Sequence, residues 1–229
     1  MSFSVVIPAR YAAQRLLGKP LLDICGKPML QHTYERALES QADRVIIATD
    51  DVRIQEAAQE FGAFVCMTSS SHASGTDRIQ EVSEQLQMAE SAVVVNVQAD
   101  EPLIPPGAIN QVAKNLQQDS EVGIATLCEA ITDKEEICDS NSVKVVIDNR
   151  GHALYFSRAT IPWRGSASAN NCYRHIGIYA YRVAVLNQFV EWPVCDLEVT
   201  EKLEQLRALY NGVGIHVAVS SQSIPPGVD

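Results

Sequence analysis

The sequence lacks the features that mark several large protein classes. None of its apolar runs can cross a membrane, because the longest are strand-sized, such as "AVVVNV" at 92–97. Its start runs directly into an apolar strand pattern, without the basic start and long apolar stretch of a signal peptide. The six cysteines form no CxxC pair and no Cys/His ligand spacing. We therefore expect no membrane insertion and a cytoplasmic location.

Two glycine-rich phosphate motifs are also missing, the dinucleotide fingerprint GxGxxG and the P-loop GxxxxGK[ST]. The missing fingerprint weighs against a redox Rossmann enzyme. Positive charge is scarce, with 18 Lys and Arg against 28 Asp and Glu and a net charge of −10. An acidic balance argues against a surface for nucleic acid. Internal repeats, low-complexity tracts and linkers are absent from the sequence, so we predict a single domain over residues 1–229.

Short runs rich in Val and Ile alternate with helical patterns. The apolar runs lie at 4–8, 44–50, 63–67, 92–97, 122–127 and 143–148, and the helical patterns at 29–40, 52–60, 75–88 and 107–118. The runs are apolar throughout rather than alternating, as is typical of strands covered on both faces. This alternation predicts an α/β fold, a doubly wound and mostly parallel sheet.

The pattern changes after about residue 150. The aromatic, β-prone stretches 151–163 and 172–183 enclose a small polar loop. We interpret them as an inserted antiparallel β unit, at about 151–183. A helix is predicted over 197–212, ending at a glycine, and a strand over 214–220.

Basic residues concentrate in the opening segment. Arg10, Arg15, Lys19 and Lys27 lie within the first 27 residues, where Asp23 is the one acidic residue. A loop after the first strand of an open α/β sheet is a common anion site. Guanidinium groups hold phosphate oxygens bidentately, and a lysine adds a mobile charge. The alternative is a solvated basic loop.

A second polar group follows the strand at 92–97. In "NVQADEP", the strand leads directly into Gln98, Asp100 and Glu101. Ligands of open α/β sheets bind at the carboxyl ends of the strands. One or two carboxylates together with substrate phosphates are typical of Mg²⁺ sites. The alternative is a simple turn before Pro102.

Several motifs together resemble one family, the 3-deoxy-manno-octulosonate cytidylyltransferases, or CMP-Kdo synthetases, of Gram-negative bacteria. In chain order they are "VVIPARYAAQRLLGKPL", "ATDD", "SGTDR", "NVQADEP", "ALYFSRATIPW", "YRHIGIYAYR", "LEQLR" and "GVD". The resemblance implies a Rossmann-like nucleotidyltransferase fold and a homodimer in which the 151–183 insertion takes part. It also implies transfer of the cytidylyl group of CTP to the anomeric hydroxyl of an anionic 2-keto sugar acid, Kdo, for lipopolysaccharide or capsule synthesis.

The resemblance also implies roles for individual residues. Those implied for the nucleotide are Pro8, Ala9, Arg10, Arg15, Lys19, Ser74 and Thr76, with Lys19, Arg10 and Asp100 as the catalytic set. Those implied for the sugar acid are Gln98, Arg158, His175, Tyr179, Glu204 and Gln205. Asp100 and Asp229 are the implied ligands of Mg²⁺. His175 and Tyr179 could instead be core aromatics, and Glu204 and Gln205 solvent-facing helix residues.

The sequence departs from the family pattern at three places. Leu17 stands where the family has proline, Ala99 stands where it has glycine, and the chain stops at Asp229 where relatives continue. Proline fixes φ, so Leu17 loosens the loop. Ala99 adds a methyl group close to the expected metal. Two alternatives therefore stay open: a cytidylyltransferase for a related acid such as 8-amino-Kdo or a sialic acid, and a catalytically impaired nucleotide-binding homologue.

Overall fold

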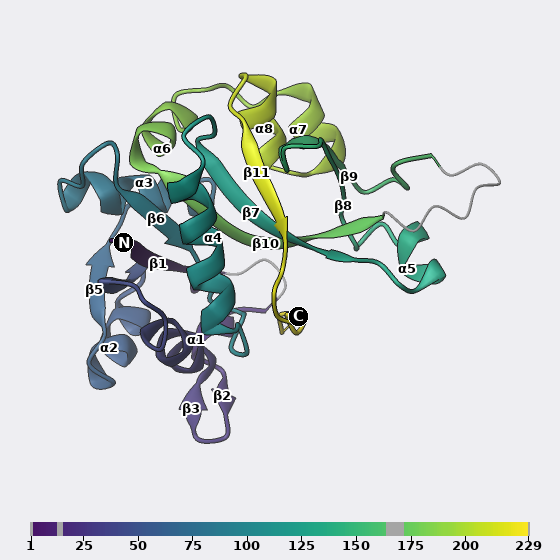
Figure 1. Ribbon diagram of the computed structural model, residues 1–229. Coiled ribbons are helices and arrows are strands. Elements are labelled where there is room, and N and C mark those ends of the chain that lie inside the picture. The colour runs from purple at the N-terminus through teal and green to yellow at the C-terminus, as the bar shows by residue number, and fades with distance from the viewer. Residues whose placement is uncertain (1, 13–15, 164–171, 229) are drawn as a thin grey trace.

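The computed structural model describes residues 2–12, 16–163 and 172–228. Its main sheet crosses the centre of the molecule (Figure 1). From one edge to the other, its strands are β11 (Ile215–Val219), β7 (Ile124–Ala130), β10 (Tyr173–Arg182), β6 (Val93–Asn96), β1 (Ser4–Ala9), β4 (Arg44–Thr49) and β5 (Phe64–Met67). The pairs β1–β4, β1–β6, β4–β5 and β7–β11 are parallel, which confirms the predicted α/β class.

Helices cover both faces of the sheet, as the doubly wound prediction requires. The apolar core on one face includes side chains of α1 (Met29–Leu38), α2 (Val52–Glu60) and α4 (Pro106–Gln118). The core on the other face includes side chains of α3 (Gly75–Gln85), α6 (Val183–Phe189) and α8 (Gln205–Tyr210). Among the described residues, no helix is both long enough and apolar enough to cross a bilayer.

The antiparallel part of the fold reaches into the centre of the sheet. Strand β10 pairs antiparallel with both β6 and β7. It also pairs with β8 (Lys144–Ile147), which forms an antiparallel ladder with β9 (Ala153–Ser157). The apolar run at 143–148 therefore forms an antiparallel strand and not one of the parallel set. The short helix α5 (Lys134–Cys138) precedes β8.

The helix expected over 197–212 is two helices. Helix α7 (Asp196–Glu201) ends at Lys202, whose φ of 54° is left-handed, and α8 begins after Glu204. The Arg207 guanidinium binds both carboxylate oxygens of Glu198, at 2.7 and 2.5 Å, and so joins the two helices across the break. A bidentate pair of this kind fixes the angle between them. The break directs Glu204 toward α3.

Strand order places a crevice between β1 and β6. From β1 the chain proceeds outward through β4 to β5, and then returns to β6 on the other side of β1. Loops leaving neighbouring strands in opposite directions open a crevice at the carboxyl ends of those strands. Residues 10–12 leave β1 there, and residues 97–100 leave β6. This is the position that the sequence predicted for the site.

Candidate functional site

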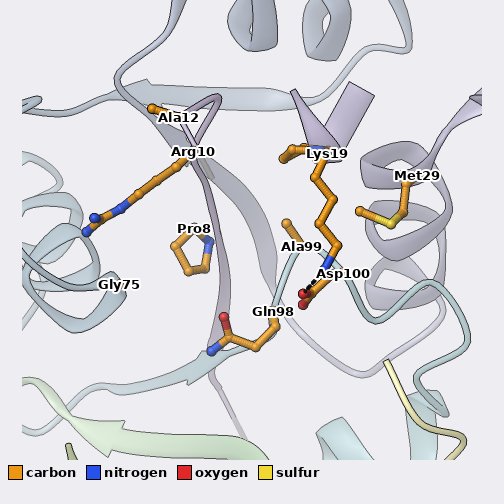
Figure 2. A pocket seen from close by; sticks show the side chains of 10 residues that line it. Pro8, Arg10, Ala12, Lys19, Met29, Gly75, Gln98, Ala99 and Asp100 are labelled. Carbon is orange, nitrogen blue, oxygen red and sulfur yellow. Dashed lines mark hydrogen bonds and ion pairs between the residues drawn. The ribbon is translucent and has the colours of Figure 1, made fainter. Parts of the chain in front are cut away.

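A cleft of about 330 Å³ lies at the carboxyl ends of β1 and β6 (Figure 2). Its lining contains five of the residues predicted from the sequence, Pro8, Arg10, Lys19, Gln98 and Asp100. Ala12, Pro20, Met29, Gly75 and Ala99 complete it. Ala9, the neighbour of Pro8, is buried within β1.

Gly18 shapes the loop that carries Lys19. Its φ is +71°, and a Cβ there would lie 3.1 Å from the Tyr11 ring, so a side chain at this position would be strained and crowded. The Gly18 N–H donates to the carbonyl of Tyr11 at 2.8 Å, which closes the loop. Leu17, the residue in place of the family's proline, is 67% exposed. The 3₁₀ helix η1 (Lys19–Leu21) follows, and a hairpin of β2 (Asp23–Ile24) and β3 (Lys27–Pro28) leads into α1.

Lys19 and Asp100 form an ion pair across the cleft. Lys19 Nζ lies 2.8 Å from Asp100 Oδ2, and the lysine side chain is 15% exposed and the aspartate side chain 39% exposed. Figure 2 shows the lysine reaching from the η1 side to the loop after β6. The pair joins residues 81 positions apart. Both groups are polar, accessible and opposite in charge, so the same site can receive a metal cation and an anionic phosphate.

Arg10 supplies a second cation. Its Nη1 donates to the carbonyl of Ala73 at 3.2 Å, while its buried Nη2 has no partner within the part of the chain that the structure describes. A buried guanidinium N–H without a partner is costly, and a phosphate oxygen would satisfy it. Arg15, the other arginine predicted for this loop, lies outside the described residues.

The C-terminal segment lies against the loop that carries Asp100. The N–H of Val228 donates to the Asp100 carbonyl at 2.9 Å, and a Cβ on Gly227 would lie 3.2 Å from the same oxygen. Asp229, the second predicted metal ligand, lies outside the described residues. Burial, and then the charge of Asp100, raises the pKa of Glu101 to about 7.

The donor set at this edge suits a magnesium ion held partly by substrate. The described residues contain no group of three or more His, Cys, Asp or Glu side chains able to hold a metal ion by themselves. They do offer the half-exposed Asp100 carboxylate, paired with Lys19, in a cleft that Arg10 also lines. Mg²⁺ is commonly bound by one or two carboxylates, waters and substrate phosphates. The residues therefore fit a magnesium–nucleotide complex better than a protein-only cage.

The start of α3 connects the cleft to Glu204. Ser74 is the N-cap of α3 and forms a capping box with Asp77. Thr76 is buried, and its hydroxyl donates to Glu204 Oε2 at 2.7 Å. Burial raises the pKa of Glu204, and hydrogen bonds from Thr76 and Ser74 oppose that rise. Glu204 is therefore no solvent-facing helix residue.

A bulge in β10 brings His175 and Tyr179 together. The pairing of β10 with β7 shifts register between Ile176 and Tyr179, and the two rings lie 5.2 Å apart. Thr126 donates to the carbonyl of Ile178 at 2.7 Å, so its oxygen accepts the Nε2–H of His175 at 3.0 Å. Desolvation lowers the pKa of His175 to about 3, which keeps the imidazole neutral. Bulges of this kind often re-aim side chains beside active sites.

Arg158 and Gln205 occupy different surroundings. Arg158 donates to the carbonyls of Glu201 and Ser140, at 2.8 and 3.0 Å, and its own carbonyl accepts from the buried Lys144 ammonium. These contacts tie β9 to α7 and do not bring Arg158 to the cleft. Gln205 lines a small closed cavity of about 40 Å³ with Glu204.

Sequence reasoning missed two side chains of this region, Tyr181 and Asn96. Both are buried, and they lie close to each other. A signal was present, because residues two apart on a strand share a face. Tyr181 follows Tyr179 by two, and Asn96 precedes Gln98 by two.

Comparisons with known proteins agree with this geometry. The family model described as cytidylyltransferase matches residues 4–216. A 3-deoxy-manno-octulosonate cytidylyltransferase of Marinobacter nauticus is 57% identical over 242 residues, covering 100% of this chain and 93% of its own. The enzyme of that name from Cellvibrio japonicus is 58% identical over 239 residues, covering 100% and 94%.

Solved structures are similar over the same span. A structure of CMP:2-keto-3-deoxy-manno-octonic acid synthetase complexed with CTP is 43% identical, with a TM-score of 0.93, and covers 100% of this chain and 92% of its own. A 4-diphosphocytidyl-2C-methyl-D-erythritol synthase has a TM-score of 0.65 at 12% identity, over 100% and 94% of the two chains. The second likeness concerns the fold alone.

Proposed function

This chain belongs to the 3-deoxy-manno-octulosonate cytidylyltransferase family, and from that premise we propose how its cleft performs the reaction. The chain is a nucleotidyltransferase that transfers the cytidylyl group of CTP to the anomeric hydroxyl of Kdo. The products are CMP-Kdo and pyrophosphate. The product would serve lipopolysaccharide or capsule synthesis.

One observation supports this assignment most strongly, the position of Lys19 and Asp100 facing each other at the β1/β6 crevice. Phosphoryl transfer relies mainly on positioning and on electrostatic stabilisation. A cation for the phosphate chain and a carboxylate for a metal are the two groups that such chemistry needs. The crevice holds both within one ion pair.

The opening loop is proposed to bind the nucleotide. When CTP binds, Lys19 would leave Asp100 for the triphosphate, and the unpartnered Arg10 Nη2 would take a phosphate oxygen. Together they neutralise the charge that grows on the departing pyrophosphate. Backbone around Pro8 and Ala9 and the hydroxyl of Ser74 are proposed to bind the cytidine. We propose a nucleotide-binding role for Arg15 as well.

The proposed ligands of the metal are Asp100, once it is released from Lys19, and Asp229. A bound Mg²⁺ would supply Lewis-acid polarisation of the α-phosphate and charge neutralisation on the triphosphate. The protein's own contribution is to present carboxylate oxygens at the open side of the cleft. Since the reacting hydroxyl and phosphate are held in place, the transfer needs no covalent enzyme intermediate.

The sugar acid would bind on the β10 side of the cleft. Gln98 lies in the lining itself, and Glu204 is connected to the rim through Thr76. His175 and Tyr179 lie together on β10, and Gln205 lies beside Glu204. Amides, a neutral imidazole and a carboxylate are suitable partners for the hydroxyl groups of a sugar. Arg158 would have to leave its two carbonyl partners to contact substrate.

We further propose a homodimer in the cytoplasm. Exposed apolar side chains lie on β9, on α7 and the segment before it, and on α8, and Figure 1 shows these elements next to one another. They include Leu154, Val194, Val199 and Tyr210. Exposed apolar groups of this kind favour a subunit contact. All six cysteines are free, which suits a reducing compartment. Light scattering of the purified chain tests the dimer.

The reaction is tested by pyrophosphate release across a panel of nucleotides and sugar acids. We expect release from CTP in the presence of Kdo and Mg²⁺, and none when the sugar acid is omitted. Faster release with 8-amino-Kdo or a sialic acid would move the assignment to that acid. Absence of release with every acid, from a protein that still binds CTP, would identify an impaired homologue.

A further inference from the structure

A buried threonine behind the cleft holds the carboxylate of Glu204. Thr76 Oγ1 donates to Glu204 Oε2 at 2.7 Å, and Thr76 is only 1% exposed. Tyr181 of β10 and Asn96 of β6 are also buried and lie close by.

The direction of this bond follows from the protons available. A threonine hydroxyl has one proton and an ionised carboxylate has none, so Thr76 is the donor. The bond therefore favours the ionised form of Glu204 and opposes the rise in pKa that burial causes.

Glu204 needs support of this kind because of its place in the fold. It is the N-cap of α8 and makes no side-chain capping bond with that helix. The left-handed residue Lys202 directs the chain away from α7 just before it. Glu204 Oε1 has no partner among the described residues and is the oxygen available to a ligand. Its other oxygen is held by an element 128 positions earlier in the sequence.

We infer that Thr76 is a positioning residue that orients the Glu204 carboxylate toward the sugar acid, an inference that rests on the proposed function. Thr76 is then a link between the two halves of the site and not a direct contact of cytidine. Because α3 begins with Gly75 in the cleft lining, directly after its N-cap Ser74, the same helix positions a nucleotide-side group and the sugar-side carboxylate.

Kinetics of hydroxyl deletions test the inference first. Thr76→Val, which keeps the shape of the side chain, should lower kcat/KM for the sugar acid by about 10- to 100-fold. CTP affinity measured without sugar acid should stay unchanged. Thr76→Ser restores the hydroxyl and should restore most of the rate.

Ser83→Ala is the matched control. Ser83 is a buried hydroxyl of the same helix, and it donates to the Gln80 carbonyl within α3. This variant should leave kcat/KM unchanged. A normal kcat/KM in Thr76→Val would overturn the inference. So would an equal loss in Thr76→Ser, because shape and not the hydroxyl would then be responsible.

A second measurement does not depend on turnover. The Glu204 carboxyl is followed by ¹³C NMR titration and assigned by its disappearance in Glu204→Gln. Thr76→Val removes a donor to the ionised form, so the pKa of Glu204 should rise above its wild-type value. The other charged or titratable groups facing Glu204 are Arg207, Asp77, Tyr179 and Tyr181. These groups are present in both proteins, so the comparison isolates the hydroxyl.

The two measurements separate the inference from the function beneath it. If wild type releases no pyrophosphate with any sugar acid, the proposed function fails, and the titration alone then decides whether Thr76 controls Glu204. An unchanged Glu204 pKa in Thr76→Val would overturn the inference whatever the activity.

Discussion

Lys19 Nζ lies 2.8 Å from Asp100 Oδ2, so in the free protein the cation expected for phosphate and the carboxylate expected for metal neutralise each other. Neither charge is left unpaired inside the cleft, which limits the electrostatic cost of holding the site open. When a magnesium–nucleotide complex binds, two new pairs would replace this one: Lys19 with the triphosphate, and Asp100 with the metal. We therefore expect Mg²⁺ to bind weakly alone and more strongly together with CTP.

Lys19→Ala tests the phosphate role of the lysine. The variant should lose a charge-assisted contact worth about 2–4 kcal/mol in the transition state, a fall of about 10²–10³ in rate. The melting temperature should change little, because the Asp100 carboxylate that is left behind is 39% exposed and can be solvated by water. Pyrophosphate release and thermal unfolding are measured on the same samples.

The opening segment provides its own control for that experiment. Lys27 pairs with Glu35 Oε1 at 2.8 Å, and both side chains are about half-exposed, at 45% and 40%. Lys27→Ala should therefore leave the rate unchanged. An equal loss in both variants would mean that the overall positive field of the loop, and not the position of Lys19, is responsible. A normal rate in Lys19→Ala would remove this lysine from the mechanism.

The choice of nucleotide tests the shape of the part of the cleft that is proposed to bind cytidine. The cleft of about 330 Å³ is bounded by Pro8 and by Gly75, at the start of α3, where a Cβ would lie 3.5 Å from the Pro8 ring. A purine would have to displace this segment. We expect CTP to be used far better than ATP or GTP in pyrophosphate release. Equal turnover of ATP would contradict the cytidylyl assignment while leaving the fold intact.

Ala99→Gly tests the departure beside the metal ligand. Ala99 is buried in the core, and its carbonyl accepts from Thr33 Oγ1 at 3.1 Å. It is not among the described residues with positive φ, so its backbone does not require glycine. We expect activity to rise or stay level and stability to fall by about 0.5–1 kcal/mol. A clear fall in activity with unchanged folding would show that the site has adapted to alanine.

The buried imidazole of His175 predicts a specific sensitivity to acid. The pKa of His175 is about 3 in the folded protein, against about 6.5 for a free histidine. Because the folded pKa is the lower one, its contribution to stability is present above pH 6.5 and is lost as the pH falls toward 3. His175→Gln keeps a polar side chain but cannot titrate there.

Urea unfolding of the two proteins measures this contribution. Between pH 7 and 4.5 the wild type should lose about 2 kcal/mol more stability than His175→Gln. Parallel pH profiles for the two proteins would mean that His175 becomes protonated without unfolding. Separately, both His175→Gln and Glu204→Ala should impair use of the sugar acid while leaving CTP binding near normal.

Much of this architecture could be predicted from local sequence. The apolar runs identified the strands, because a strand that is covered on both faces needs apolar side chains along almost its whole length. The meeting of Lys19 and Asp100 also follows from a general rule, since parallel strands end at one edge of the sheet.

Other features depend on contacts that no local pattern reports. Lys202 ends α7 in a left-handed conformation that lysine rarely adopts, and the Arg207–Glu198 pair accompanies it across the break. The bulge that joins His175 to Tyr179 is held by Thr126, from another strand. Arg158 binds carbonyl groups whose positions depend on the whole β9–α7 packing. The sequence alone therefore locates the cleft more surely than its sugar side.

The metal site is tested by removing its two proposed carboxylates. Asp100→Asn and Asp229→Asn should each abolish most turnover, and the double variant should be scarcely slower than either single one, because residues that act as a unit are not additive. Additive losses would indicate two independent roles. A structure with Mg²⁺ and CTP should place both carboxylates within roughly 4–6 Å of each other. A separation beyond about 10 Å in a closed, ordered state would exclude Asp229.

The most direct test of the proposed function is the initial rate of pyrophosphate release by Asp100→Asn at saturating CTP, Kdo and Mg²⁺. We expect a fall of at least about 10³ relative to wild type, from a folded protein with an unchanged melting temperature. A rate within a few-fold of wild type would contradict the assignment of cytidylyl transfer to this cleft.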